Sequence, residues 1–178
     1  MNVIALQDDD EALYEILDGE RVETTPMGVT AFRLANFLAS RMILHAVPGD
    51  LGETIVEGLF HLPLPVDRNR RPDVAFVSYT RWPMGTPTDR KANAWEVVPE
   101  LIVEIVSPTD QVEELMRKIN EYFQAGVMLV WVVHVEQGLV YVYESPTRVV
   151  VLGRGDALDG GAVLPGFRLE LSQLFREE

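Results

Sequence analysis

The sequence contains no cysteine, which excludes disulfides, thiolate metal sites and cysteine nucleophiles. Basic residues are also scarce. Fifteen lysines and arginines stand against 28 aspartates and glutamates, so the formal net charge is −13. A protein with this balance repels nucleic acid unless its basic residues gather in one place. Charge alone therefore argues against a general nucleic-acid-binding protein.

Long apolar runs are missing as well. No stretch approaches the roughly 20 apolar residues that a membrane span needs, so no membrane association is expected. Residues 1–6 are followed at once by a cluster of acids and lack the basic start of a signal peptide. Together with the absence of cysteine, this favours a cytoplasmic protein.

The composition is otherwise that of a globular protein, with 47% hydrophobic and 24% charged residues. The 178 residues are close to the usual size of one domain, about 150 residues, so we predict a single domain over residues 1–178. A chain of this length can bury roughly 70% of its unfolded surface without disulfides or metals.

Strand and helix patterns are mixed along the chain, which indicates an α/β (α+β) fold. Asp18-Gly19 between two alternating runs predicts an N-terminal β-hairpin. Apolar residues at helical spacing predict helices over 29–46 and from about 107 to 125, and Gly126 ends the second. We predict further strands over 53–62, 73–78, 99–106, 127–135, 139–144 and 148–152.

The least regular stretch covers residues 79–98 and holds Trp82 and Trp95. A long loop in a compact domain is usually functional or mobile. The alternative is an insertion that its two tryptophans pack against the core. The sequence leaves both interpretations open.

The strand over 99–106 carries an unexpected carboxylate. Side chains alternate between the two faces of a strand, and here both faces are apolar apart from Glu104. This pattern predicts an interior strand covered on both sides. A buried, unpaired carboxylate is costly, so Glu104 should have either a cationic partner or a metal ion.

A second lone acid, Asp73, directly follows Pro72 at the start of another apolar strand. Two acids on adjacent strands would repel each other, and a divalent cation would relieve that repulsion. The alternative is that Glu104 pairs with a lysine while Asp73 caps a turn, because structural ion pairs produce the same pattern.

The helix that follows bears on this site. At 100° per residue, four polar positions form one file along its flank: Gln111, Glu114, Lys118 and Tyr122. Lys118 borders the apolar stripe, so its ammonium could reach the end of the Glu104 strand. The alternative is an exposed ion pair between Lys118 and Glu114. We take Lys118 as a candidate catalytic residue, and Gln111 and Tyr122 as candidate substrate-binding residues.

Several short motifs follow one another along the chain in a characteristic order. They are Tyr-Glu-Ile-Leu-Asp-Gly-Glu at 14–20, Arg-Pro-Asp-Val-Ala-Phe-Val at 71–77, Val-Glu-Ile-Val-Ser-Pro at 103–108, Lys118 followed by Tyr122, Ala-Gly-Val at 125–127 and Trp-Val-Val at 131–133. Over nearly the whole chain this arrangement resembles the Uma-two family of putative restriction endonucleases, which is placed in the PD-(D/E)XK nuclease superfamily. The resemblance implies a restriction-endonuclease-like mixed β-sheet flanked by helices.

The resemblance also implies a function. Asp73, Glu104 and the Ile105 carbonyl would hold Mg²⁺ (or Mn²⁺) for hydrolysis of phosphodiester bonds in nucleic acid, with DNA the expected substrate. The superfamily places a lysine two positions after the second acid, where this chain has Val106. The resemblance suggests that Lys118 replaces it. The chain departs from the family in having His134 where an aspartate is usual and Val130 where an aromatic residue is usual.

A different class of function remains open: a catalytically inactive nuclease fold that serves as a binding or assembly module. The position of the basic residues would distinguish the two, because a nuclease should gather them around the acids. The residues concerned are Arg33, Arg41, Arg68, Arg70, Arg71, Arg90, Lys91 and Lys118.

The C-terminal strands are long, apolar and poor in lysine, and exposed sheet edges of this kind invite pairing. We therefore predict a homodimer that covers either residues 131–143 or the tryptophan-bearing loop. The alternative is a monomer in which residues 169–175 cover the edge.

Overall fold

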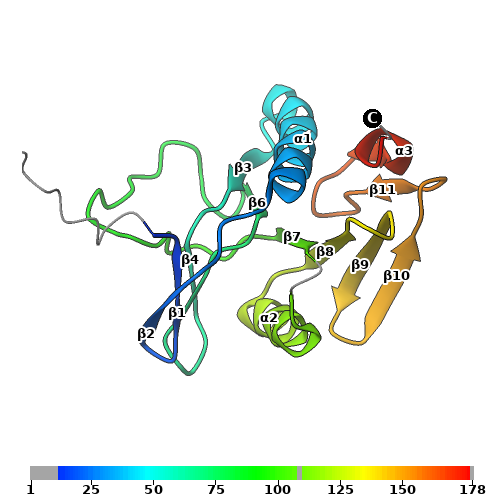
Figure 1. Cartoon of the computed structure of the whole chain (residues 1–178). Coiled ribbons are helices and arrows are strands. Elements are labelled where there is room, and N and C mark those ends of the chain that lie inside the picture. The colour runs from blue at the N-terminus through cyan, green and yellow to red at the C-terminus, as the bar shows by residue number, and fades with distance from the viewer. Residues whose placement is uncertain (1–11, 108–109, 177–178) are drawn as a thin grey trace, which may run out of the picture.

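The computed structural model describes residues 12–107 and 110–176. A six-stranded sheet divides the molecule into layers, with α1 on one face and α2 on the other (Figure 1). Its strand order is β10-β9-β8-β7-β6-β3, and β7 and β8 run parallel while the other neighbours are antiparallel. The strands are β3 (Gly52–Val56), β6 (Val74–Ser78), β7 (Leu101–Val106), β8 (Leu129–His134), β9 (Leu139–Ser145) and β10 (Arg148–Leu152). The predicted mixed sheet flanked by helices is confirmed.

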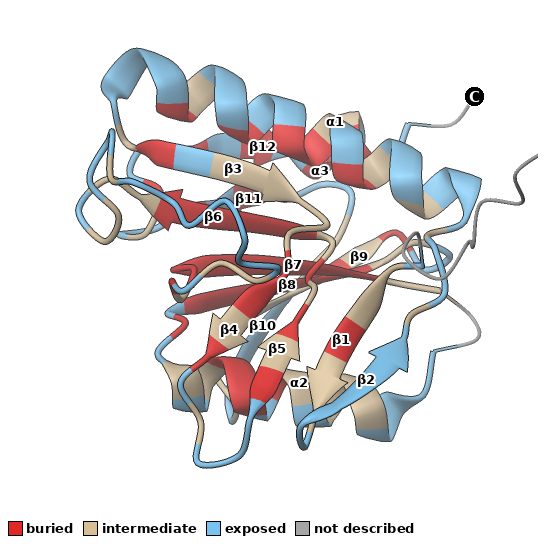
Figure 2. Ribbon diagram, turned by 90° about the vertical axis from the view of Figure 1, so that its left-hand side faces the viewer, coloured by how far each residue is buried: buried red, intermediate tan, exposed pale blue. Residues whose placement is uncertain are grey.

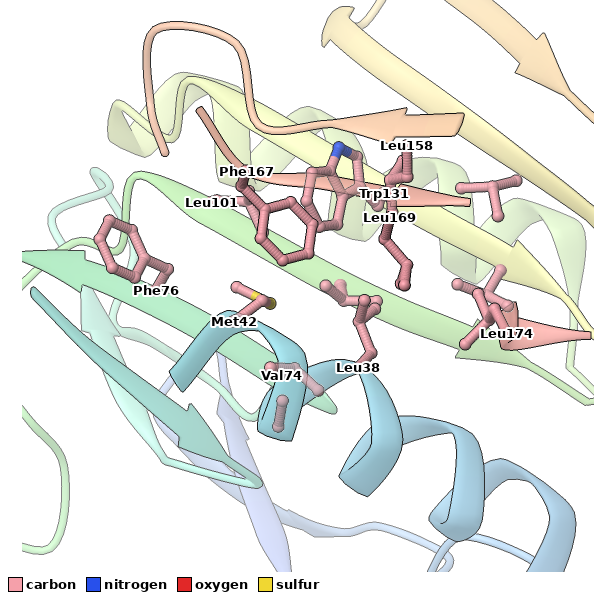
Figure 3. Close-up of a cluster of buried hydrophobic side chains, with 14 of the residues drawn as sticks. Leu38, Met42, Val74, Phe76, Leu101, Trp131, Leu158, Phe167, Leu169 and Leu174 are labelled. Atoms are coloured by element: carbon pink, nitrogen blue, oxygen red, sulfur yellow. The ribbon is translucent and has the colours of Figure 1, made fainter. Parts of the chain in front are cut away.

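Helix α1 (Val29–Ala46) covers one face with the C-terminal segment. Its apolar residues recur at helical spacing and bury Leu38 and Met42 against the sheet, where Trp131 stacks on Phe167 with ring centroids 5.8 Å apart (Figure 3). The helix ends in the 3₁₀ turn η1 (Val47–Gly49), as Pro48 and Gly49 predict. The C-terminal elements are β11 (Ala157–Asp159), β12 (Arg168–Glu170) and α3 (Leu171–Leu174).

Helix α2 (Val112–Ala125) lies on the opposite face and ends at Gly126, whose φ of 103° is the left-handed conformation that glycine tolerates. It buries Ile119 and Tyr122 against Ile102 and Val132 of the sheet. The helix begins at Val112, later than the predicted start near residue 107. The Asp110 side chain instead accepts a hydrogen bond from the Ser107 amide at 2.7 Å, just before the helix, and residues 108–109 fall outside the described part.

A second sheet, in the order β2-β1-β5-β4, lies on the α2 side of the main sheet (Figure 2). Its strands are β1 (Tyr14–Leu17), β2 (Glu20–Glu23), β4 (Phe60–Leu62) and β5 (Arg68–Arg70). Strands β1 and β2 form the predicted hairpin around Asp18-Gly19. Strand β5 was not predicted, because Arg-Asn-Arg has no apolar pattern and its three residues looked like part of a turn.

The single strand predicted over 53–62 is wrong. Glu57 adopts a left-handed conformation (φ 51°), so β3 ends at Val56 and the chain turns into the second sheet at β4. Gly58 follows, and a Cβ there would lie 2.6 Å from the Ile55 side chain. One apolar run therefore supplies strands to two sheets.

Residues 79–98 form no helix or named strand, as predicted. Trp82 and Trp95 contact each other edge to face at 5.4 Å, and Trp95 stacks on Phe60 at 5.8 Å. The interpretation as a packed insertion is therefore the one that the structure supports. Within the described residues, no helix combines the length and apolarity needed to cross a membrane.

Candidate active site

The two acids singled out in the sequence meet at the boundary between β6 and β7. The antiparallel register pairs Val74 with Val103, so the next pair along the strands is Asp73 and Glu104. Cross-strand partners project from the same face of a sheet. Both side chains line a cavity of about 730 Å³, together with residues from the α2 start and from the segment that leads into α1.

Glu104 is 7% exposed and has two partners from α2. The Tyr122 hydroxyl donates a hydrogen bond to Oε1 at 2.5 Å, and the Lys118 ammonium lies 3.6 Å from Oε2. Burial raises the pKa of Glu104, and Lys118 and Tyr122 oppose that rise. The carboxylate is thus fixed through both oxygens.

Asp73 accepts a hydrogen bond from the Ile105 amide at 2.6 Å. Burial and the neighbouring charge of Glu104 raise the pKa of Asp73 to about 7, despite that hydrogen bond and the pull of Lys118. Ionising Asp73 beside Glu104 is therefore unfavourable in this buried position, and the protein's own donors only partly offset that cost.

Lys118 points into the molecule. Its ammonium lies 3.6 Å from Glu104 and 3.4 Å from Glu15, a residue of the N-terminal hairpin. Burial disfavours the charged form, but the two carboxylates outweigh it and raise the pKa of Lys118. The alternative pairing with Glu114 is wrong, since Glu114 contacts Arg70 at 3.0 Å and also pairs with Arg117.

Glu15 belongs to an ionic cluster that sequence reasoning missed. Arg70 is fully buried and donates to Glu15 and to Glu121, each at 2.7 Å, and the Arg71 amide donates to Glu15 at 2.9 Å. These contacts, with Lys118, hold the pKa of Glu15 below its usual value even though burial raises it. Nothing in the hairpin sequence marks Glu15 for this role, because its partners lie more than 50 residues away.

Comparison with known proteins identifies the family and the fold. The model of the Uma2 (Uma-two) family, described as putative restriction endonuclease, matches residues 3–172. The chain belongs to the Uma2 family. A crystal structure of a putative nuclease belonging to DUF820 from Anabaena variabilis shares the fold, with a TM-score of 0.77 at 16% identity over 91% of this chain and 89% of that one. No curated protein matches.

The remaining site predictions divide in two. Gln111 precedes the first residue of α2 and lines the cavity, where a substrate could reach it. Tyr122 is fully buried beneath Glu104, and its hydroxyl is directed at that carboxylate. In this Uma2 protein, Tyr122 therefore supports Glu104 and offers no surface to a substrate.

The donors present suit a hard divalent cation. No group of three or more His, Asp or Glu side chains among residues 12–107 and 110–176 could hold a metal ion. Two adjacent carboxylates are nonetheless what Mg²⁺ commonly uses, because it keeps several waters and takes further ligands from substrate phosphates. The unfavourable ionisation of Asp73 next to Glu104, which a bound cation would relieve, fits the same ion.

The basic residues do not gather around the acids. Arg71 and Lys118 line the cavity, but Arg68 and Arg70 turn into the ionic cluster beneath it. The other four residues proposed for this test, which the structure also describes, do not line it: Arg33, Arg41, Arg90 and Lys91. Both cations that line the cavity are already engaged, Lys118 with Glu15 and Glu104, and Arg71 with the Tyr14 and Glu57 carbonyls.

Proposed function

We propose that this Uma2-family protein is a metal-dependent endonuclease that hydrolyses phosphodiester bonds of nucleic acid, with DNA as substrate and the cytoplasm as its location. The observation that carries the proposal is the juxtaposition of Asp73 and Glu104 at the floor of a cavity, with the Lys118 ammonium 3.6 Å from Glu104. Oxygen ligands for a divalent cation and a positive charge near the reacting phosphate are groups that such chemistry uses.

The ligands proposed for Mg²⁺ or Mn²⁺ are Asp73, Glu104 and the Ile105 carbonyl. The N–H and C=O of a strand residue point to the same neighbour, and the Ile105 N–H points at Asp73. By register the residue opposite Ile105 is Pro72, which has no N–H to donate to that carbonyl. The ion, when bound, would supply Lewis-acid polarisation of the phosphate and acidify a bound water.

The other residues have distinct proposed roles. Lys118 would stabilise the negative charge that develops on the phosphate, or orient the attacking water. Gln111 would contact the substrate from the rim of the cavity. Tyr122 would fix the orientation of Glu104, as supporting hydrogen bonds commonly do for metal ligands.

A second candidate follows from the scattered arginines and the net charge of −13. A module that binds or assembles with another molecule, and no longer cleaves nucleic acid, would need no basic surface around its acids. The buried ion pair between Glu104 and Lys118 would then be structural. The two candidates differ in one measurable property, which is cleavage in the presence of a divalent cation.

We also propose a homodimer, but on a different surface. Trp131 is fully buried under the C-terminal segment, so residues 131–143 cannot supply the whole interface. Strand β10 is one of the two edge strands of the main sheet, and its Val149, Val150 and Val151 are each more than 40% exposed. A stable interface there would bury about 1,200–2,000 Å² in total. Light scattering at micromolar protein checks this against the single-chain mass of 20.0 kDa.

The function is tested by comparing wild type with Asp73→Asn, Glu104→Gln and Lys118→Ala on linear, supercoiled and single-stranded DNA with Mn²⁺. Lys91→Ala is the matched control, since Lys91 is exposed and does not line the cavity. The first two variants should lose both Mn²⁺ binding and cleavage. Lys118→Ala should keep Mn²⁺ binding and lose cleavage. Mn²⁺ binding without any cleavage by wild type would establish the module instead.

A further inference from the structure

Lys118 has one more partner than the proposed chemistry requires. Its ammonium lies 3.4 Å from Glu15 and 3.6 Å from Glu104, so two carboxylates share one cation. Glu104 comes from the strand that would bind the metal. Glu15 comes from β1, in a separate sheet, and does not line the cavity.

Glu15 is held firmly by groups that have no place in the chemistry. Its Oε2 accepts a hydrogen bond from Arg70 at 2.7 Å, and its Oε1 accepts one from the Arg71 amide at 2.9 Å. The residue is 3% exposed. Charge-assisted contacts of this length are strong and directional, so the Glu15 carboxylate has little freedom to move.

The two partners of Lys118 would behave differently once a cation binds. Glu104 would place its negative charge on the cation and attract the ammonium less. Lysine has a long, flexible side chain, and an ammonium beside a divalent cation is repelled by it. Without a second anchor Lys118 would leave the cavity when the metal arrives.

We propose that Glu15 is a positioning residue for Lys118, which keeps the ammonium at the cavity wall when Glu104 is engaged by the metal. This inference rests on the proposed function. It gives the N-terminal hairpin a role in the proposed active site, although no residue of β1 or β2 lines the cavity.

The sequence offers an unusually direct test, because Lys91 and Lys118 are its only lysines. Limited acetylation of the full-length protein, followed by peptide mass spectrometry, measures the reactivity of each amine separately. Lys91 is exposed and serves as the internal reference. We expect wild-type Lys118 to react more slowly than Lys91, both with and without saturating Mg²⁺.

In Glu15→Gln, Lys118 acetylation should rise about tenfold, the effect of losing one charge-assisted contact, with Lys91 unchanged. Added Mg²⁺ should raise it further in this variant alone. Glu121→Gln is the matched control, because Glu121 is also buried and also accepts a hydrogen bond from Arg70 at 2.7 Å. The pairs that the structure gives for Lys118 are to Glu15 and Glu104, and none is to Glu121. Its Lys118 reactivity should match wild type.

Two results would overturn the inference: equal Lys118 reactivity in Glu15→Gln and Glu121→Gln, or a wild-type Lys118 that becomes as reactive as Lys91 when Mg²⁺ binds. Calorimetry with Mn²⁺ on the same samples separates this from a failure of the proposed function, which would appear as no cation binding by wild type. If Glu15→Gln does not fold, Glu15→Asp keeps a carboxylate for Arg70 with a shorter reach, and its Lys118 should show the same increase.

Discussion

The two faces of the six-stranded sheet are built on different principles. The α1 face is a continuous apolar core in which Leu38, Met42 and Trp131 are fully buried (Figure 3). The α2 face combines a smaller apolar cluster with a chain of buried charges that runs from Arg70 through Glu15 and Lys118 to Glu104. Each helix turns buried residues toward the sheet and carries exposed residues on its outer side (Figure 2).

Burial on the α1 face serves the stability of the fold, whereas the charges of the α2 face also belong to the proposed active site. Apolar burial stabilises the fold wherever it occurs, whereas buried charges carry a desolvation cost that their pairing only partly offsets. The α2 face accepts that cost beside the cavity, where the proposed chemistry would need charged groups. Removing an apolar side chain from the α1 face should therefore lower stability alone, whereas changes among the buried charges of the α2 face should alter stability and can also alter activity.

The largest effect is expected from removing the central cation of the α2 face. Arg70→Ala leaves Glu15, Glu114 and Glu121 without their shared partner, which should lower the free energy of unfolding by about 3–5 kcal/mol. Urea denaturation at pH 7 measures this. Arg168→Ala, which removes an exposed pair with Glu170, is the control and should stay within about 0.5 kcal/mol of wild type. Equal losses of stability in Arg70→Ala and Arg168→Ala would contradict the difference expected between buried and exposed ion pairs.

On the α1 face, Leu38→Ala should cost about 2–5 kcal/mol through lost burial and a cavity. Cleavage per folded molecule should not change, because Leu38 lies on the opposite side of the sheet from Asp73 and Glu104. The measurement pairs urea denaturation with cleavage assays at a temperature where both proteins are folded. A selective loss of cleavage would show that the two faces are coupled.

Asp73→Asn should raise the free energy of unfolding, whereas the two preceding substitutions lower it. It removes a charge whose pKa is raised to about 7 by burial and by Glu104, while an amide oxygen can still accept the Ile105 N–H. At pH 8 without divalent cation we expect the variant to be more stable than wild type by about 1–3 kcal/mol. Thermal denaturation in EDTA provides the test, and a less stable variant would show that the charge is already compensated.

The raised pKa of Asp73 also predicts how the stability of the fold depends on pH. An acid with a raised folded-state pKa binds more protons in the folded than in the unfolded state between pH 3.8 and about 7. Its contribution to stability is therefore present at low pH and is lost as pH rises toward 7. The stability difference between Asp73→Asn and wild type should be near zero at pH 4, grow up to about pH 7 and then level off. A difference that is constant over this range would exclude Asp73 as its source.

The smallest effect on folding is expected at the sheet edge. Val150→Lys, on the exposed strand β10, should change the free energy of unfolding by no more than about 0.5 kcal/mol. It should nevertheless prevent the proposed dimer, because a charge on an edge strand opposes pairing. Light scattering of both proteins at equal concentration would decide, and a dimeric variant would move the interface elsewhere.

The sequence by itself determined the local elements of this protein. Apolar spacing predicted α1 from Val29 to about Ala46, and Asp18-Gly19 predicted the hairpin. It also marked Asp73 and Glu104 as exceptional, because a carboxylate within an apolar strand is visible without any knowledge of its neighbours. These signals are local, since they depend on the period of a helix or a strand.

Only the tertiary structure decided which charges meet. Lys118 could have paired with Glu114 four residues away, but the docking of the second sheet brought Arg70 to Glu114 and Glu15 to Lys118. The division of residues 53–62 between two sheets, at Glu57, makes that docking possible. Such pairings depend on the register and packing of segments far apart in the chain, and no periodicity in the sequence encodes them.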